Sequence, residues 1–526
     1  MNRNRHTRRM QEQRHLLKSA GMISGATVLS RILGLARDVL TARLFGTSLI
    51  YDAFVIAFMI PNLLRGLMGE GSLNAAFIPV FSSYLAKGQK EEALSLANIV
   101  LTIILMTLSG CVIAVIFGVE LWLHQGNLSF KLVTTLKLVQ ILSPYMLFIC
   151  LAGLMMGVLN GFKHFVVPAF APVILNIVWI ISLFVLCPQF GDSLNDKIYG
   201  LAIGILIAGV LQFVVQVPVA KRFGFHPFQL SWNLKHPSVL KICKLMVPVI
   251  IAYAVTQINV VVDISLAYWL GQGMQSSLWY AQRILYFPLG VFGVAMSVVI
   301  MPTLSEFAAK QQFEELLDTL SYALRAVLMI ILPCAVAILV LNREMVSLFY
   351  ERGAFDAISV NQTAFALFCY AIGLVAFAGN KIVVPAYYAM QDTKTPVRIG
   401  IFCVLLNLVL NLVLMGPLKQ GGLALATAIS AFANLGILFY FLENKVGNFR
   451  WAPMISCGLK VIAISIIYGV LCWGVHKGVV YIMEPSFIRK IVEVFLPLTV
   501  AFAVTGGLYC FCGMRELYVF FGSRMK

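Results

Sequence analysis

Long apolar runs follow one another along almost the whole chain, and short polar connections separate them. A helix needs about 20 apolar residues to cross the hydrocarbon part of a bilayer. Because the bilayer interior offers no water to backbone groups, such runs are expected to form helices. We therefore predict an all-α integral membrane protein with fourteen transmembrane helices. The predicted spans are residues 21–46, 50–69, 92–118, 134–158, 166–187, 198–219, 241–269, 276–300, 319–341, 361–389, 396–415, 420–442, 454–475 and 490–513.

Composition agrees with this class of protein. Of the 526 residues, 60% are hydrophobic and 12% are charged, whereas a soluble protein carries about 25% charged residues. The formal net charge is +17, but Lys and Arg are spread over short loops and tails. No soluble domain is expected that could hold a nucleic acid, so a nucleic-acid partner is excluded. The eleven cysteines lie mostly in apolar runs and are interpreted as small buried side chains.

The distribution of positive charge predicts the orientation in the membrane. Residues 1–20 are basic and polar, without the apolar core and cleavage site of a signal peptide. They are interpreted as a cytoplasmic anchor, which also suits contact with anionic lipid headgroups. Loops after even-numbered helices are richer in Lys and Arg than the opposite loops, so both termini are expected in the cytoplasm. Loop 476–490 runs against this bias, because it holds three basic residues.

The chain also repeats itself. Three segments of the first half recur in the second half, shifted by 223, 225 and 231 positions. Six predicted helices separate the copies, so both copies have the same orientation. This predicts two parallel six-helix lobes around a central cavity plus a C-terminal helix pair, and such repeats are typical of transporters that bind cargo between the halves. The matching segments are 78–94 with 301–317, 38–46 with 263–271, and 159–176 with 390–407.

The repeat and the loops divide the chain into five predicted parts. Between the two lobes, aromatic residues stand among basic ones, which favours a segment lying in the cytoplasmic membrane interface; a plain tether is the alternative. The parts are the basic cytoplasmic segment (1–20), the first lobe (21–222), the interfacial linker (223–240), the second lobe (241–443), and the last helix pair with the cytoplasmic C-terminus (444–526).

Four arginines lie inside segments that are otherwise apolar: Arg31, Arg37, Arg65 and Arg283. An arginine at mid-bilayer costs about 3 kcal/mol on insertion scales, so four facing lipid would cost on the order of 10 kcal/mol. We therefore expect these side chains to face the protein interior or a water-filled cavity. The planar guanidinium binds phosphate or carboxylate through two parallel hydrogen bonds, so such a cavity suits an anionic cargo.

The first predicted helix carries several of these charges. Arg31 and Asp38 are seven residues apart and share one helical face. An internal Arg–Asp pair that only orders the bundle is one interpretation; the excess of arginines over nearby acids favours cations that line a cavity. Arg43 lies near the outer end and is expected to snorkel, without a role in cargo binding. Arg283 has no acidic residue within one turn, which makes it a strong candidate for binding cargo.

Other charged residues are candidates for the cavity or its gates. Asp52 and Glu70 lie near opposite ends of the second predicted helix, where each could make gate contacts; helix capping is the alternative. Lys381 either reaches the cavity or snorkels to the interface. Together with Asp38, these residues form the predicted cavity or gate set.

A further polar group suggests a cation site. Asp263 is an acid in the middle of an apolar run, Asn407 and Asn411 are one turn apart, and Thr427 lies in the next predicted helix. Carboxylate and amide oxygens suit a hard cation such as Na⁺. We take the four as a candidate sodium site, with plain polar contact between helices as the alternative. No other cofactor is predicted, and Na⁺ enters as a candidate coupling ion.

The strings SRILGLARDVLTARLFG, YDAFVIAFMIPNLLRGLMGEGSLNAAFIPVF and QDTKTPV resemble the MurJ (MviN) family. These are lipid II flippases of the multidrug/oligosaccharidyl-lipid/polysaccharide superfamily, and the resemblance covers nearly the whole chain. It implies movement of the undecaprenyl-pyrophosphate-linked peptidoglycan precursor from the inner to the outer leaflet of the bacterial cytoplasmic membrane. It also implies that the four arginines are cavity arginines, that Asp38, Asp52 and Glu70 match acidic positions, and that the last helix pair forms a groove for the polyprenyl tail.

Two positions depart from the family pattern. Some members have an acid one turn after the arginine at 283, where this chain has Tyr286, so one partner of a salt-bridge gate is missing. In some members Na⁺ is held by residues matching Asp263, Asn407 and Thr427, with an Asp where this chain has Asn411. The loss of one carboxylate weakens the case for sodium.

The resulting hypothesis is a monomeric lipid II flippase for cell-wall synthesis that works by alternating access and is not an enzyme. Lipid II and membrane lipids are the expected partners, with the cell-wall synthesis machinery as a further candidate. The alternatives are an efflux carrier for drugs or another lipid-linked glycan, an enzyme acting on polyprenyl phosphates, and a non-transporting scaffold for cell-wall enzymes. A cationic cavity would repel drug cations, which disfavours a drug carrier. The histidines are isolated, which disfavours a metal-assisted enzyme. A scaffold would tolerate Arg→Ala at all four positions.

Overall fold

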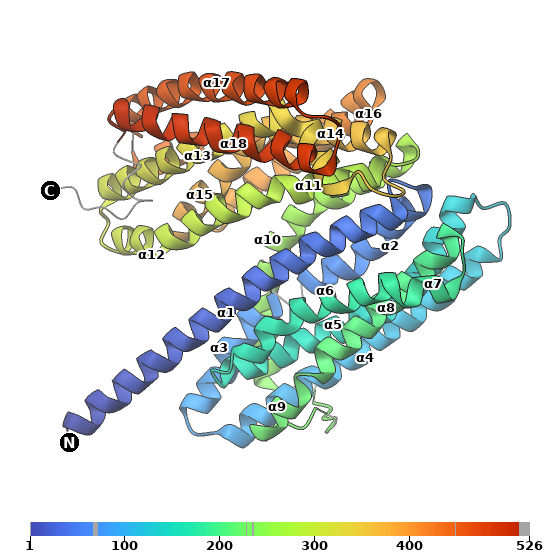
Figure 1. The fold of residues 1–526 in the computed structure, drawn as a ribbon. Coiled ribbons are helices and arrows are strands. Elements are labelled where there is room, and N and C mark those ends of the chain that lie inside the picture. Colours follow the sequence, from blue (N-terminus) through green and yellow to red (C-terminus); the bar gives the residue numbers. More distant parts are fainter. Residues whose placement is uncertain (1, 67–71, 228, 234–235, 448, 515–526) are drawn as a thin grey trace. The chain divides into compact units, whose positions relative to one another are not determined.

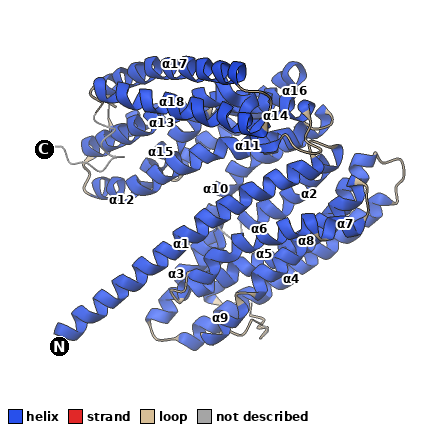
Figure 2. Ribbon diagram, in the orientation of Figure 1, coloured by secondary structure: helices blue, strands red, loops and turns tan. Residues whose placement is uncertain are grey.

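The computed structural model describes residues 2–66, 72–227, 229–233, 236–447 and 449–514. Within these ranges the chain forms helices and no strand (Figures 1 and 2), which confirms the all-α prediction. The chain divides into two compact units, Met1–Gln257 and Ile258–Lys526. The boundary between them falls inside one helix, α10. The finer division into five parts stays a prediction.

The first unit is built around α5, which packs against α2, α3, α4 and α8, while α1 packs against α6. The most apolar stretch of α5 is 72% buried, against 39% for the corresponding stretch of α4. Serine side chains begin several of these helices: the backbone N–H of Tyr51 donates to Ser48, and that of Leu132 donates to Ser129. The helices are α1 (Asn2–Phe45), α2 (Leu49–Leu64), α3 (Ser72–Ala86), α4 (Lys90–Leu123), α5 (Phe130–Gly161), α6 (Val166–Phe184), α7 (Leu186–Phe190), α8 (Leu194–Val214), α9 (Val217–Arg222) and the start of α10 (Pro237–Ala267).

The second unit is built around α13, which packs against α12, α14, α15, α17 and α18. Helix α16 covers α14 and α15, and α17 pairs with α18. The elements are the end of α10, η2 (Tyr268–Leu270), α11 (Met274–Pro288), η3 (Leu289–Val294), α12 (Ala295–Ala309), α13 (Phe313–Tyr350), α14 (Ala357–Ile372), α15 (Leu374–Ala389), α16 (Lys394–Val446), α17 (Trp451–Ile482) and α18 (Phe487–Phe511).

Several predicted spans differ in detail from the observed helices. The predicted helix 276–300 is interrupted by the π-helical turn η3, directly after Pro288, as expected where a proline removes a backbone donor. The predicted helices 396–415 and 420–442 run together as α16, with a break at Lys419, whose φ of 49° lies in the left-handed region. Helices α14 and α15 are two halves of one predicted span, bent by 46°.

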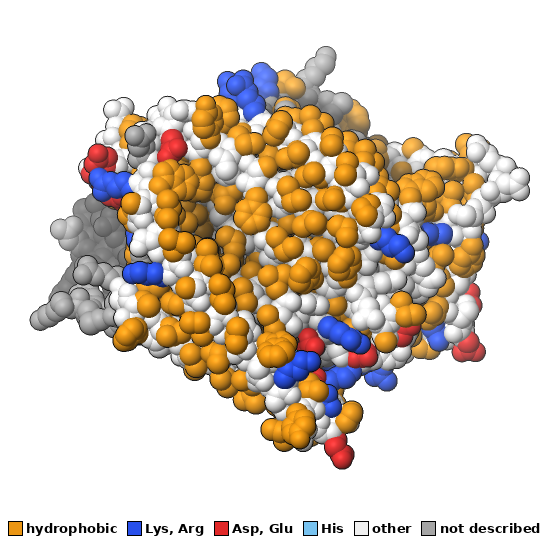
Figure 3. Space-filling model, turned by 90° about the horizontal axis from the view of Figure 1, so that it is seen from above, with side chains coloured by type: hydrophobic (Ala, Val, Ile, Leu, Met, Phe, Trp, Pro, Cys, Tyr) orange, Lys and Arg blue, Asp and Glu red, His pale blue; other side chains and the backbone are white. Residues whose placement is uncertain are grey.

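The described residues contain nine helices that are long and apolar enough to cross a membrane, or ten when the bent pair α14–α15 is taken as one span. The count of fourteen therefore stays a prediction. Large hydrophobic side chains such as Phe402, Leu412 and Val413 of α16 are exposed on the surface. In Figure 3 hydrophobic side chains cover much of the face shown, and charged side chains gather mainly near its margins. Such a surface suits contact with lipid rather than water.

Candidate functional site

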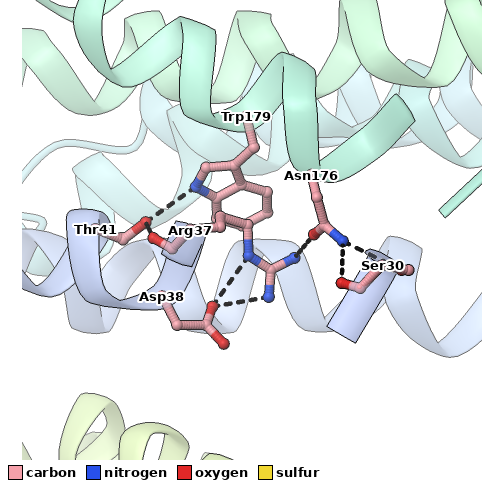
Figure 4. A network of polar contacts seen from close by, with 6 residues as sticks. All are labelled: Ser30, Arg37, Asp38, Thr41, Asn176 and Trp179. Atoms are coloured by element: carbon pink, nitrogen blue, oxygen red, sulfur yellow. Dashed lines mark hydrogen bonds and ion pairs between the residues drawn. The ribbon is translucent and has the colours of Figure 1, made fainter. Parts of the chain in front are cut away.

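Arg37 of α1 is held by a network of side chains from α1 and α6 (Figure 4). Its Nε and Nη2 atoms both donate to Oδ1 of Asp38, at 3.0 and 2.7 Å. Its Nη1 atom donates to Oδ1 of Asn176, at 3.0 Å. The side chains of Arg37 and Asp38 are only 12% and 7% exposed. A nearly buried carboxylate is thus paired with a nearly buried guanidinium, which lowers the cost of removing both from water.

Two side chains of α6 fix the position of this guanidinium, and neither was singled out from the sequence. The carbon Cζ of Arg37 lies 4.6 Å from the centre of the Trp179 ring, a distance typical of a cation–π contact. Trp179 in turn donates from Nε1 to Oγ1 of Thr41, at 3.1 Å. Asn176 donates from Nδ2 to the backbone oxygen of Ser30, at 2.9 Å. Helix α6 therefore both orients Arg37 and anchors to α1 on either side of it.

Within the first helix, an Arg–Asp pair forms between two adjacent residues. Asp38 forms its ion pair with Arg37, whereas Arg31, which shares a helical face with Asp38, is exposed. Adjacent residues diverge by about 100° on a helix, but the long arginine side chain is able to turn back to its neighbour. Arg43 is also exposed. Of the arginines of α1, Arg31 is the one whose guanidinium lies open at a predicted mid-membrane position.

The second helix is followed directly by one arginine. Arg65 follows the last residue of α2 and donates from Nε to Oδ1 of Asn62, at 3.2 Å. Helix α2 ends at Leu64, whereas the predicted span runs to residue 69. Glu70, predicted to act at a gate, lies outside the described residues.

Asp52 is fully buried in the first turn of α2. Its Oδ2 atom lies 3.9 Å from Nζ of Lys131, which belongs to the first turn of α5 and is itself buried. The position of Asp52 near a helix N-terminus favours its negative charge, and the lysine adds an opposite charge. Lys131 was not among the candidates from the sequence, because its partner is contributed by a different helix.

In the second unit, Arg283 of α11 lies over an aromatic ring. Its Cζ atom is 4.2 Å from the centre of the Trp279 ring, one turn earlier on the same helix. This partner of Arg283 is an aromatic ring rather than the acidic residue whose absence marked Arg283 in the sequence. The tryptophan ring attracts the cation through its face.

The four residues of the candidate sodium site lie together. Asn411 donates from Nδ2 to Oδ1 of Asp263 at 2.7 Å and to Oδ1 of Asn407 at 3.0 Å. Thr427 donates to Oδ2 of Asp263 at 2.8 Å. Asn407 and Asn411 are completely buried and Asp263 is 4% exposed. Helices α10 and α16 thus bring one carboxylate, two amides and one hydroxyl into a single buried cluster.

A cavity of about 460 Å³ in the second unit reaches this cluster. Lys381 is exposed and lines this cavity of the second unit; whether it reaches a central cavity between the lobes stays a prediction. Tyr286 also lines it. Two members of the cluster, Asp263 and Thr427, contribute to its wall.

The donor set of the cluster fits an alkali cation better than a transition metal. In the described ranges no group of three or more His, Cys, Asp or Glu residues lies close enough to hold a metal ion. The cluster instead offers carboxylate, amide and hydroxyl oxygens, which suit hard cations. The Oδ1 atom of Asn411 is buried and accepts no hydrogen bond from the described residues. Because its amide is able to turn, this oxygen could face Asp263 in place of the nitrogen.

The sequence of this chain is similar to those of known proteins of one family. A family model described as "Lipid II flippase MurJ" matches residues 41–493. A probable lipid II flippase MurJ from Vibrio cholerae is 34% identical over 489 residues, which cover 88% of this chain and 92% of that protein. A lipid II flippase MurJ from Burkholderia cenocepacia is 35% identical over 452 residues, covering 84% and 86%.

Solved structures show the same relationship. A lipid II flippase MurJ in an inward closed conformation superimposes with a TM-score of 0.77 at 27% identity, covering 93% of this chain and 98% of that one. A multidrug resistance MATE family transporter of the MOP superfamily, in an inward-facing conformation, superimposes with a TM-score of 0.66 at 15% identity, covering 80% and 96%. The second comparison speaks for the fold alone.

Proposed function

Because this chain belongs to the lipid II flippase MurJ family, we propose that it moves lipid II from the inner to the outer leaflet of the bacterial inner membrane. The match over residues 41–493, which covers most of both predicted lobes and the first helix of the last pair, carries this proposal. The many apolar helices support a multi-pass membrane protein. We propose that it is a transporter rather than an enzyme, that it works by alternating access, and that both termini lie in the cytoplasm.

Arginine side chains are proposed to bind the pyrophosphate of the cargo. Arg31 is exposed at a position predicted to lie inside the membrane, so its guanidinium is available to an anion. Arg65 and Arg283 are oriented by Asn62 and Trp279, which reduces the side-chain entropy lost when a ligand binds. A guanidinium binds phosphate oxygens through paired, charge-assisted hydrogen bonds. Arg37 is proposed to contribute through the charge it holds beside Asp38.

The cluster around Asp263 is proposed to bind Na⁺ as a coupling ion. Its support is the convergence of Asp263, Asn407, Asn411 and Thr427 on one buried point. For the ion to bind, the amide of Asn411 must turn its oxygen toward Asp263, because the nitrogen would repel a cation. Binding would add a positive charge to a buried carboxylate and so favour whichever conformation of the second unit closes over it.

Complementation of a flippase-depleted bacterium tests the proposal. Lipid II exposed at the outer leaflet is measured in cells that carry this chain, Arg31→Ala or Arg43→Ala. We expect wild type and Arg43→Ala to restore exposure, and Arg31→Ala to lower it at least tenfold at equal membrane abundance. Wild-type activity of Arg31→Ala would refute the role of Arg31 in cargo binding. Failure of the wild-type chain itself, with export of a different lipid-linked glycan, would identify another cargo.

A further inference from the structure

The sequence repeat places the Arg37 network and the Asp263 cluster at equivalent positions of the two units. The match of 38–46 with 263–271 aligns Asp38 with Asp263. The match of 159–176 with 390–407 aligns Asn176 with Asn407. Each unit therefore carries an aspartate from one helix and an asparagine from another at the same two repeat positions.

In both units, one side chain donates hydrogen bonds to these two residues at similar distances, through separate guanidinium nitrogens in the first unit and through a single amide nitrogen in the second. In the first unit, the guanidinium of Arg37 donates to Oδ1 of Asp38 at 2.7 Å and to Oδ1 of Asn176 at 3.0 Å. In the second unit, Nδ2 of Asn411 donates to the equivalent oxygens at 2.7 and 3.0 Å. The point between the aspartate and the asparagine is thus occupied by a charged group in one unit and by a neutral amide in the other.

The remaining positions of the two sites have changed in a compensating way. The repeat aligns Asn411 with Ile180, and the shared Gly-Leu-Ala of 200–202 and 422–424 aligns Thr427 with Ile205. The first unit therefore lacks two of the oxygen-bearing side chains of the second unit. The repeat also aligns Arg37 with Val262. The first unit thus has Arg37 where the second has Val262, and it has two isoleucines where the second has Asn411 and Thr427.

We propose that the guanidinium of Arg37 is a tethered cation, which fills in the first unit the position that a free cation would fill in the second. The side chain of Asp38 is 7% exposed, and a buried charge of this kind needs a counter-charge. Arg37 supplies it permanently, so the first unit is independent of ions in solution. Arg37 is then a positioning residue that holds α6 against α1, and its charge beside Asp38 is set by this contact rather than by an ion from solution.

This role follows from the geometry of the first unit alone and holds whether or not the second unit binds sodium. It predicts that removing the tether creates a vacant cation site. In Arg37→Ala, the oxygens of Asp38 and Asn176 remain, and the face of Trp179 is uncovered. That site has the shape and hydrogen-bonding pattern of a guanidinium ion, because a guanidinium occupied it in the parent protein.

The test measures thermal unfolding of the purified protein in lipid nanodiscs. We expect Arg37→Ala to lower Tm by several degrees, and millimolar guanidinium chloride to recover at least half of the loss, whereas choline chloride does not. Arg37→Ala/Asp38→Asn has no buried charge to compensate, so it should be more stable than Arg37→Ala and should not respond to guanidinium. Arg43→Ala, which changes an exposed arginine of the same helix, is the matched control and should respond to neither salt.

An Arg37→Ala protein whose Tm is unchanged, or is lowered without recovery by guanidinium, would overturn the proposal. If this variant does not fold, Arg37→Lys takes its place, because an ammonium reaches Asp38 but does not span to Asn176. Its Tm should lie below that of the wild type, because the contact with Asn176 is lost, but it should not rise with guanidinium, because the ammonium already compensates Asp38; a wild-type Tm, or a rise with guanidinium, would overturn the proposal. Because the readout is stability, its outcome is separate from that of the transport assay on Arg31→Ala.

Discussion

The Nδ2 atom of Asn411 lies 2.7 Å from Oδ1 of Asp263, and the two residues come from helices α16 and α10. The amide donates a hydrogen bond to a buried carboxylate, which stabilises the cluster when no cation is bound. The same amide nitrogen occupies the position between Oδ1 of Asp263 and Oδ1 of Asn407 at which a cation would bind. If the cluster binds Na⁺ as proposed, the residue at position 411 sets the balance between the hydrogen-bonded form and the ion-bound form.

Asn411→Asp is expected to strengthen Na⁺ binding. A second carboxylate beside Asp263 repels it when no cation is present and adds an attractive charge when one is bound. We expect the apparent affinity for Na⁺ to rise about tenfold, equivalent to about 1.4 kcal/mol. The measurement is Tm as a function of NaCl concentration, at an ionic strength held constant with choline chloride.

Thr427→Val provides the opposite change, since it removes a cluster oxygen at nearly constant volume. It should weaken the response of Tm to NaCl. An Asn411→Asp protein that responds to NaCl and choline chloride alike would show that the cluster only joins helices, which was the alternative reading of these residues.

Lys131→Met is expected to destabilise the first unit by about 2 kcal/mol. Breaking a buried ion pair costs about 3–5 kcal/mol when the pair is tightly bonded, and here Nζ of Lys131 lies 3.9 Å from Asp52, so the loss should be smaller. The measurement is the free energy of unfolding, or Tm, in nanodiscs. Lys137→Met, at an exposed position of the same helix, is the control and should be nearly neutral.

Asp52→Asn in the Lys131→Met background separates electrostatics from packing. If the ion pair matters, the double variant should recover part of the stability, because the buried carboxylate no longer needs a counter-charge. Equal stability of Lys131→Met and the double variant would assign the loss to the lysine stem alone.

The helical fold followed from apolar runs, but its breaks did not. Hydropathy averaged over about 20 residues predicts where a helix lies, but it does not predict the dihedral angles of a single residue within it. The left-handed conformation of Lys419 and the π-turn after Pro288 depend on how neighbouring helices replace lost backbone contacts. Helix α3 (Ser72–Ala86) was read as a connection, since its apolar run is shorter than a membrane span.

Within the sites, polar residues inside apolar runs were easy to find and their partners were not. Asp263 and Asn411 each stand out from an apolar background, so their side chains were recognised before their contact was known. Trp179 is one aromatic residue among many, and its contact with Arg37 joins residues far apart in the chain. Asn176 could have been found, because the repeat had already aligned it with Asn407.

Gly422→Ala is expected to destabilise the second unit by about 3 kcal/mol, at the upper end of the cost of overpacking. A Cβ atom at Gly422 would overlap the backbone carbonyl of Leu414, which lies across the break of α16 and has little freedom to move. The measurement is the fraction of folded protein after extraction, together with Tm. Gly436→Ala changes the same helix where nothing lies within 4 Å of the new methyl group, so it should be neutral or slightly stabilising.

Asp392, in the connection between α15 and α16, makes stability depend on pH. Burial on its own raises the pKa of this carboxyl, but hydrogen bonds from Lys445 and Thr395 outweigh it and lower the pKa to about 2. Nζ of Lys445 lies 2.7 Å from Oδ2, and the backbone N–H of Thr395 lies 3.0 Å from Oδ1. Because the folded pKa lies below the unfolded one, the carboxylate stabilises the folded protein at neutral pH.

Asp392→Asn should therefore remove one part of the acid sensitivity. The stabilisation by Asp392 is fully present above about pH 4 and is lost as the pH falls toward about 2. It should amount to about 1 kcal/mol, since the side chain of Lys445 is 42% exposed and water screens its charge. Tm measured from neutral to acidic pH should fall less steeply for Asp392→Asn than for wild type, although the variant is less stable at pH 7. Lys445→Met leaves the carboxyl in place but removes its cation, so the acid-induced loss should begin at a higher pH. Parallel curves for all three proteins would mean that the Asp392–Lys445 contact does not form in the membrane.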